Sequence, residues 1–378
     1  QPKVFSEELF RWVGEYGPGS PWAEKNHGDE KLIKESHALQ ETTLRNHILR
    51  LHQAAQNAKS EYTRAQAQEA YHLYLKSFPS TDKTAEMRFF YAELLYDMKK
   101  YELAANNYIW VVENDSKGQF REKALVNALL ALEKGLPSEA ELAKARGNSI
   151  EPIPMEKNVQ QFESVARKYM QEFPKGARTP DIQFRLGQLY YLHNHFDKAL
   201  AEFDDIIRKY PESQYAEYSA NLTLDIYNLR KDYVGLEKAG RKFLANPKFA
   251  NSKVGKQIGS LIERASFKSA QDLETGNNYL ASAKRYEKFS SQYKSSELKT
   301  SAQFNAAVNY ERAGHIEKAM GLYTSVIQSR DPKSQPLRDK SRRLVARLYE
   351  QTGQYERAAK EFEVLAAEET RKDKKSKE

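Results

Sequence analysis

Small and aromatic residues recur along this chain at fixed intervals, and mostly polar residues fill the positions between them. The clearest copy of the pattern contains Leu186, Gly187, Tyr190, Ala199, Phe203 and Pro211. Three more copies keep the same register: Ala92, Leu95, Ala104 and Tyr108; Ala307, Tyr310, Ala319 and Tyr323; and Ala346, Tyr349, Ala358 and Phe362. A period of about 34 residues with these positions predicts tandem pairs of antiparallel helices.

Each position of the pattern has a physical reason. Two helices pack closely only where small side chains meet, so a small residue is expected in each helix at the crossing. The predicted crossings are Gly187 with Ala199, Ala307 with Ala319, and Ala346 with Ala358. Gly314 and Gly353 are expected in turns, where a left-handed glycine ends the first helix of a pair. Proline disfavours helix in the residue before it, so three aromatic–proline pairs are expected to end second helices: Phe78-Pro79, Phe173-Pro174 and Tyr210-Pro211.

The pattern loosens in the middle of the chain. Weaker copies begin near Glu217 and near Glu263. Residues 134–155 interrupt one hairpin as an insertion, in which a helix is expected to start near Ser138 and residues 151–154 (Glu-Pro-Ile-Pro) are expected to be extended.

These features predict a layout in four parts. The parts are an irregular, aromatic-rich segment over residues 1–29, N-terminal helices over 30–79, a solenoid over 80–370 with the insertion at 134–155, and a basic disordered tail over 371–378. The aromatic residues of the first part are Phe5, Phe10, Trp12, Tyr16 and Trp22. They either cover the open apolar end of the solenoid, the interpretation we favour, or form a partner-binding peptide. The tail is expected to be solvated, with contact to an anionic partner as the alternative.

Composition adds an expectation about the compartment. The chain has no cysteine, which favours an oxidising compartment such as the bacterial periplasm over the cytoplasm. Its longest apolar stretch, residues 124–132, is about half of the ~20 residues that a membrane-spanning helix needs. The chain opens on Gln1-Pro2 without an initiator Met, which is consistent with removal of a targeting segment. The net charge of +8 is modest for 378 residues.

Together these residues resemble the tetratricopeptide-repeat (TPR) family over about residues 65–370. The resemblance implies a right-handed TPR superhelical solenoid of about seven helical hairpins, preceded by an N-terminal helical section. Runs such as Phe173-Pro174-Lys175-Gly176-Ala177 look like the bacterial envelope branch of the family. That branch includes the repeat lipoprotein of outer-membrane barrel assembly and periplasmic partners of the Tol–Pal system, and the chain also resembles repeat proteins of gliding motility machines.

The family binds extended peptides or helices along a concave face lined by the first helix of each hairpin. The resemblance therefore implies a partner-binding face, and the residues expected to bind on it are Tyr96, Tyr191, Asn221, Asp225, Asn228, Asn305, Arg343 and Arg347. The same face is expected to present Phe89, Glu93, Phe184, Gln188 and Phe304. Asn and Tyr can hydrogen-bond an extended backbone, and Arg can pair with a carboxylate through two bonds.

No catalytic motif stands out in the sequence. Gly-rich phosphate loops, G-x-S-x-G and H-E-x-x-H are absent, and the lack of cysteine excludes a thiol nucleophile. His193 and His195 are two residues apart and would point in different directions on a helix, so a metal site is not expected there. We expect no enzyme activity, no cofactor and no small-molecule substrate.

The resulting interpretation is a non-enzymatic scaffold that binds a protein or peptide in a TPR groove, within a periplasmic cell-envelope complex that can associate with the membrane. A cytoplasmic regulator or secretion chaperone is the main alternative. Nucleic-acid binding by helical repeats is less consistent with the sequence, because Lys and Arg are interleaved with Glu and Asp. An enzyme whose active site lacks a recognisable motif is the third alternative.

Overall fold

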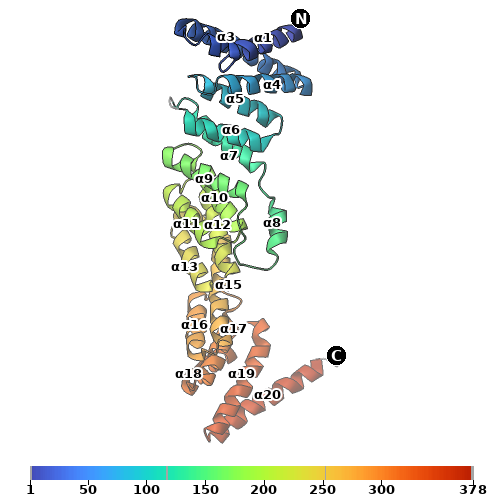
Figure 1. Ribbon diagram of the computed structural model, residues 1–378. Coiled ribbons are helices and arrows are strands. Elements are labelled where there is room, and N and C mark those ends of the chain that lie inside the picture. Colours follow the sequence, from blue (N-terminus) through green and yellow to red (C-terminus); the bar gives the residue numbers. More distant parts are fainter. Residues whose placement is uncertain (1, 116–117, 252, 376–378) are drawn as a thin grey trace. The chain divides into compact units, whose positions relative to one another are not determined.

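The computed structural model describes residues 2–115, 118–251 and 253–375, and every regular element in these ranges is a helix (Figure 1). The helices form two compact units, Gln1–Tyr215 and Ala216–Glu378, which we call the N-terminal unit and the C-terminal unit. The prediction of an all-α chain of helical hairpins is confirmed. The solenoid expected as one run over 80–370 divides after Tyr215.

The N-terminal unit starts with four helices. They are α1 (Pro2–Tyr16), α2 (Pro21–Lys25), α3 (Glu30–Ala58) and α4 (Glu61–Ser77). The prediction that residues 1–29 are irregular is therefore wrong. Leu9 and Val13 lie one turn apart on α1 and are 5% and 2% exposed, so burial of this stripe stabilises a helix that the nearby Gly and Pro residues did not suggest.

Contacts of α1 support its role as a cover for the end of the helical stack. Ser6 Oγ and Nε2 of His47 on α3 are 2.8 Å apart, and the ring of Phe5 meets the His47 ring edge-on. The rings of Tyr16 and Trp22 pack against each other at 5.8 Å. These contacts favour the capping interpretation of the N-terminal aromatic residues.

Three hairpins complete the N-terminal unit. They are α5 (Thr84–Asp97) with α6 (Tyr101–Asn114), α7 (Arg121–Glu133) with α9 (Lys157–Glu172), and α10 (Thr179–Leu192) with α11 (Phe196–Lys209). The insertion between α7 and α9 contains α8 (Glu139–Arg146). Its start is confirmed at Ser138, whose side chain and that of Glu141 form a reciprocal capping box.

Four hairpins form the C-terminal unit, the first of them beginning at its boundary. They are α12 (Gln214–Leu229) with α13 (Tyr233–Leu244), α15 (Lys253–Thr275) with α16 (Tyr279–Gln292), α17 (Lys299–Arg312) with α18 (Ile316–Ile327), and α19 (Gln335–Gln351) with α20 (Tyr355–Lys375). Two short elements, α14 (Pro247–Asn251) and the 3-10 helix η1 (Pro332–Ser334), precede α15 and α19. None of the helices described in either unit is long and apolar enough to cross a membrane.

Two predicted boundaries in this unit differ from the structure. The first helix of the hairpin expected near Glu263 starts at Lys253, because residues such as Ile258 extend its buried face backwards. The tail expected to be disordered from residue 371 continues α20 as far as Lys375, since straight-chain charged residues favour helix and follow it without a break. Residues 376–378 lie outside the described part.

Small residues bring the paired helices together, as the pattern predicted. Ala307 and Ala319 share one buried cluster with Tyr310 and Tyr323. At Gly187 on α10 the predicted neighbour was Ala199, but the side chain that comes closest is Phe203 on α11. A Cβ on Gly187 would lie 2.7 Å from Cε1 of Phe203.

Six hairpin turns use one residue with a left-handed backbone: Lys99, Asn194, Lys231, Asn277, Gly314 and Gly353. The glycines at 314 and 353, with φ of 79° and 73°, confirm the predicted turns. At the first of them the N–H of Gly314 donates to Glu311 O at 3.0 Å, and the next N–H donates to Tyr310 O at 2.9 Å. Two such bonds satisfy the carbonyl groups at the end of the first helix, which explains why Lys and Asn are tolerated in the other turns.

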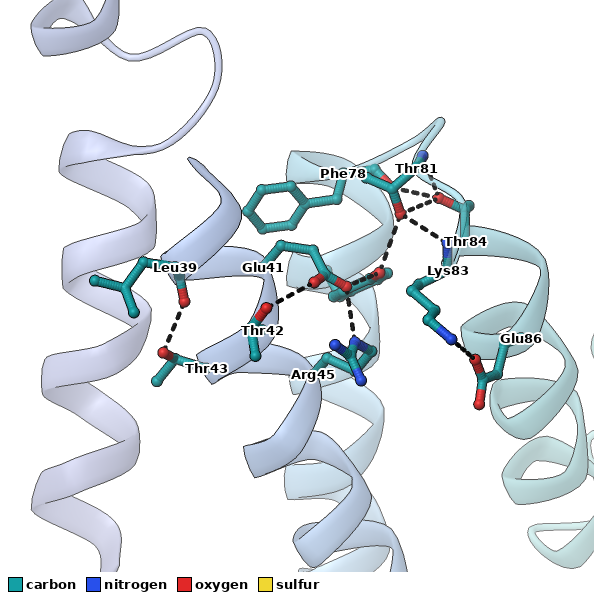
Figure 2. A network of polar contacts seen from close by, with 11 residues as sticks. Leu39, Glu41, Thr42, Thr43, Arg45, Phe78, Thr81, Lys83, Thr84 and Glu86 are labelled. Carbon is teal, nitrogen blue, oxygen red and sulfur yellow. Dashed lines mark hydrogen bonds and ion pairs between the residues drawn. The ribbon is translucent and has the colours of Figure 1, made fainter. Parts of the chain in front are cut away.

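Buried tyrosines link successive helices through their hydroxyl groups. Figure 2 shows the network around Glu41 on α3, which accepts bonds from Tyr74 Oη at 2.7 Å and Arg45 Nε at 2.9 Å. The same pairing recurs in the C-terminal unit, where Tyr310 Oη donates to Glu287 at 2.6 Å. Burial and this hydrogen bond raise the pKa of Tyr310 to about 12. These bonds add directional contacts to the apolar packing between helices.

The histidines of α3 give this region a pH dependence. Burial lowers the pKa of both His47 and His52. The positive charge of Arg50 lowers the pKa of His47 further, whereas the negative charge of Asp97 offsets part of the decrease at His52. Neutral His52 bonds Tyr71 Oη through Nδ1 at 2.8 Å. Because the unfolded chain binds these protons more readily, stability present above about pH 6.5 is lost as the pH falls below that value.

We therefore expect thermal unfolding of the N-terminal unit to move down by a few degrees between pH 7.5 and pH 5.5, where the acidic endpoint lies below the usual pKa of histidine. The His52→Gln variant should show a smaller shift, measured by circular dichroism at both pH values. His27→Gln, which changes an exposed histidine, serves as the matched control. An equal pH shift in wild type and both variants would contradict the assignment to His52.

Candidate binding groove

Two neighbouring pockets lie on the face formed by the first helices of the hairpins in the N-terminal unit. The first, which we call the acidic pocket, has a volume of about 290 Å³ and is lined by Gln56, Glu93, Tyr96, Asp97, Tyr108, Asn127 and Leu130. The second, the central pocket, has a similar volume. Leu130 on α7 lines both of them, so the pockets are adjacent parts of one groove.

The acidic pocket is lined by two carboxylates. Glu93 and Asp97 lie one turn apart on α5, and no basic residue is among the lining residues. Burial raises the pKa of Glu93, and the charge of Asp97 raises it further, while Lys123 lowers it in part. Within the described residues neither carboxylate has a salt-bridge partner, so the pocket presents negative charge that is incompletely neutralised.

Aromatic and amide groups complete the walls of the acidic pocket. Tyr96 is half-buried and packs edge-on against Tyr101, with ring centres 5.3 Å apart. Tyr108 on α6 is 2% exposed, and its pKa is raised by burial and by the charge of Glu93. Gln56 is held in place by His52, whose Nε2 lies 3.2 Å from the Gln56 amide nitrogen. An ammonium or guanidinium group entering here would meet two carboxylates and two side-chain amides, which favour a cation.

The lining of the central pocket combines apolar side chains with charged groups of both signs. Its lining residues are Val126, Leu129, Leu130, Glu133, Phe162, Arg178, Asp181, Ile182, Phe184, Arg185, Gln188 and Tyr215. Arg185 Nε lies 2.8 Å from Glu133, and Arg185 also donates to Gln188 at 2.7 Å. Tyr215 Oη donates a hydrogen bond to Asp181 at 3.1 Å. The ring of Tyr215 packs against the ring of Phe184, with ring centres 5.4 Å apart. These mutual contacts compensate the charges, so the pocket suits an uncharged apolar side chain.

The structure brings together only part of the predicted binding face in this groove. Tyr96 and Glu93 line the acidic pocket, and Phe184 and Gln188 line the central pocket. The expectation for Phe89 is wrong: this side chain is 4% exposed and packs inside the hairpin against the rings of Tyr108 and Phe120. Tyr191 is half-buried near the end of α10, and its ring lies 6.1 Å from that of Phe196.

The remaining predicted site residues belong to the C-terminal unit. On α12, Asn221 and Asn228 are exposed and Asp225 is half-buried. On α17, Asn305 is half-buried.

On α19, Arg343 and Arg347 are both exposed. The Arg347 guanidinium forms an ion pair with Glu311, which also accepts a bond from Tyr323 Oη at 2.9 Å. Pairing of an incoming carboxylate with Arg347 would therefore compete with an existing contact, and the role of these residues stays a prediction.

Sequence reasoning missed most of the groove residues, including several from α3, α5 and α7. They include Gln56, Asp97, Asn127, Val126, Leu129 and Leu130. The four-residue spacing of Glu93 and Asp97 in the sequence predicts that both lie on one face of a helix. On α7, Ala124 and Ala128 pack inside with 0% exposure, which leaves Val126 and Leu130 facing away from that contact.

The paired histidines that follow α10 have structural contacts. His193 is 1% exposed and its Nδ1 donates to Leu189 O at 2.8 Å. His195 Nε2 donates to the carbonyl oxygen of Ile153 in the insertion at 2.9 Å. Within the part of the chain that the structure describes, no three His, Asp or Glu side chains gather closely enough to hold a metal ion.

Comparison with known proteins gives one family match. Residues 181–213, which cover most of the hairpin α10–α11, match the tetratricopeptide repeat model. The sequence matches no curated protein.

Similar solved structures include a tetratricopeptide repeat protein from Parabacteroides merdae, at 11% identity over 78% of this chain and 98% of that chain, with a TM-score of 0.32. Another is the apo form of the quorum sensor NprR from B. thuringiensis, at 11% identity over 97% of both chains and a TM-score of 0.28. A third is yeast Tom70, at 12% identity over 97% of this chain and 92% of that chain, with a TM-score of 0.23. The chain therefore carries a tetratricopeptide repeat over residues 181–213, set within a series of helical hairpins.

Proposed function

We propose that this chain is a non-enzymatic scaffold that binds an exposed segment of a partner protein in the groove of its N-terminal unit. A Lys or Arg side chain of the partner occupies the acidic pocket, and a neighbouring apolar side chain occupies the central pocket. The groove is formed by packed helices, so a partner segment would bind without a large rearrangement of the scaffold, which limits the entropy cost of binding.

The observation that carries the proposal is the partly buried Glu93 beside Asp97, with no cation lining the same pocket. Lys123 offsets the charge of Glu93 only in part, although the whole chain has a net charge of +8. A bound cation would remove the unfavourable repulsion between the two carboxylates. It would also be held by charge-assisted hydrogen bonds, which are about twice as strong as neutral ones.

The test begins with a phage-displayed library of random 12-residue peptides selected on the wild-type protein. Enriched peptides should contain Lys or Arg next to an apolar residue. The double variant Glu93→Gln/Asp97→Asn keeps the shape of the pocket but removes its charge. It should bind the most enriched peptide, made with a fluorescent label, about 10- to 100-fold more weakly in fluorescence anisotropy, because pairing with a desolvated charge is lost.

The matched control is Glu102→Gln/Glu113→Gln, which removes two charges from exposed positions on α6 of the same hairpin. This control should bind the peptide as wild type does. Enriched peptides without a cationic residue, or an equal loss of affinity in the control and the pocket variant, would refute the assignment of the acidic pocket.

We also propose that the scaffold works in a bacterial cell-envelope complex on the periplasmic side. The absence of cysteine and the resemblance of the repeats to envelope members of the family support this proposal. Osmotic-shock fractionation of the native organism, followed by immunoblotting, should recover the protein with periplasmic markers. Recovery with cytoplasmic markers would favour the regulator or secretion-chaperone interpretation instead.

A further inference from the structure

The insertion between α7 and α9 has two parts that are held in different ways. Residues 149–153 run along the turn after α10 and bind it mainly through their backbone. The N–H of Ile153 donates to His193 O at 2.8 Å, and His195 Nε2 donates to Ile153 O at 2.9 Å. Asn194 Nδ2 donates to the carbonyl oxygens of Ser149 and Glu151 at 3.1 and 3.0 Å. These four bonds fasten this part, which we call the arm.

By contrast, α8 has few attachments to the rest of the unit. Only one of its side chains is buried, Leu142, at 5% exposure. Glu139 accepts a bond from Gln188 Nε2 at 3.2 Å, and this is the contact of α8 with the lining of the central pocket. The capping box of Ser138 and Glu141 stabilises the helix from within, so α8 does not depend on the groove for its N-terminal cap.

Both ends of α8 have features suited to a hinge. Gly147, the residue that ends the helix, has a φ of 55° and no atom within 4 Å of where a Cβ would lie, so the joint between helix and arm is open. Before α8, Asn158 Nδ2 holds the carbonyl of Gly135. The segment from Leu136 to Gly147 is thus attached at fixed points on either side, with a single buried side chain between them.

We propose that α8 is a hinged strap that closes over the Gln188 end of the central pocket and regulates entry of a partner into the groove. The inference rests on the proposed function of the groove. In the closed state the side-chain amide of Gln188 donates to Glu139, and in the open state this amide becomes available to a partner at the edge of the pocket. A ligand that needs the open state binds more weakly by the fraction of time that the strap is open.

The first experiment measures strap opening without any partner. Because the chain has no cysteine, Val126→Cys introduces a single thiol in the lining of the central pocket. Its reaction rate with the disulfide reagent DTNB reports access to the pocket while Gln188 keeps its bond to Glu139. Adding Leu142→Asp removes the buried anchor of α8, and the thiol should react at least about fivefold faster. The control adds Leu103→Asp instead, because Leu103 on α6 is already 50% exposed. This substitution should leave the reaction rate of the thiol unchanged. Equal rates in all three proteins would overturn the strap.

The second experiment measures binding of the labelled peptide selected on the wild-type protein. Leu142→Asp should bind it about tenfold more tightly, and Leu103→Asp should match wild type. In Glu139→Cys/Gln188→Cys joined by a short bismaleimide, the strap is held shut and affinity should fall about tenfold below that of the same protein with its two thiols capped separately. Unchanged affinity in the crosslinked and Leu142→Asp proteins would make α8 a fixed wall and refute gating.

The two proposals fail in different ways. If no peptide binds wild type or any variant, the proposed function of the groove is refuted, and the thiol rates alone still decide whether α8 opens. If peptides bind with the expected dependence on Glu93 and Asp97 but ignore the state of α8, the groove stands and the strap is refuted. Circular dichroism of each variant checks that the helical content is retained.

Discussion

Replacement of Gly187 with valine is expected to lower the free energy of unfolding of the N-terminal unit by about 3 kcal/mol, because overpacking of a filled core costs about this much. Any Cβ at this position would lie 2.7 Å from Cε1 of Phe203 and 3.1 Å from Cβ of Glu202. Phe203 is fully buried, so its ring cannot turn away without moving α10 or α11. Thermal unfolding followed by circular dichroism should show a midpoint lower by roughly 6–12 °C.

The matched control for this prediction is Gly14→Val. Gly14 is also helical, on α1 of the same unit, but no atom lies within 4 Å of where its Cβ would be. Its replacement should change stability by less than about 1 kcal/mol, since only helix propensity differs. If the Gly187→Val and Gly14→Val variants unfold at the same temperature, the close approach of α10 and α11 at Gly187 does not set the distance between these two helices.

The second large effect is expected for Glu237→Ala in the C-terminal unit, at about 3 kcal/mol of destabilisation. Glu237 on α13 is 7% exposed and accepts bonds from Arg241 Nε and Nη2 at 3.1 and 2.9 Å. It also pairs with Arg285 on α16, whose Nε donates to Ser269 on α15 at 2.8 Å. Removal of the carboxylate would leave two guanidinium groups close together without an anion between them, and would unlink three helices.

An exposed ion pair of the same unit is the control for Glu237. Glu297 and Lys333 lie 3.2 Å apart with side chains 87% and 79% exposed. Surface pairs of this kind contribute about 0–1 kcal/mol, so Glu297→Ala should unfold close to wild type. Urea titration of the two variants provides the comparison, and equal midpoints would contradict a structural role for the buried network.

Local sequence determined the hairpins because each depends on residues close to one another in the chain. Gly314 and Gly353 adopt the left-handed turn conformation that their place between two helices predicted. Ser138 begins a helix through its capping box, which needs only the next three residues. The helix α1 was missed because its stability comes from burial of Leu9 and Val13, which no local signal reports.

The candidate site was predicted only in part, because its residues come from distant segments. Sequence register placed Tyr96, Glu93 and Gln188 on the face of the first helices, and this is where they lie. The sequence register also predicted Phe89 on the face of the first helices, but the Phe89 ring is buried inside the hairpin. Which positions on a helix face solvent depends on the neighbour that packs against it, and a single repeat does not specify that neighbour.

The sequence by itself determined that this protein is all-helical, that its helices pair in tandem, and where most pairs turn, because small residues, glycine and proline act over one or two turns of chain. Only the tertiary structure decided that Gln56, Glu93 and Asn127 from three helices share one acidic pocket. It alone decided that the arm at Ile153 is fastened to His193 and His195, about 40 residues further along. The physical reason is that pockets and straps are formed by packing between segments distant in the chain, whereas hairpins are formed by contacts within one segment.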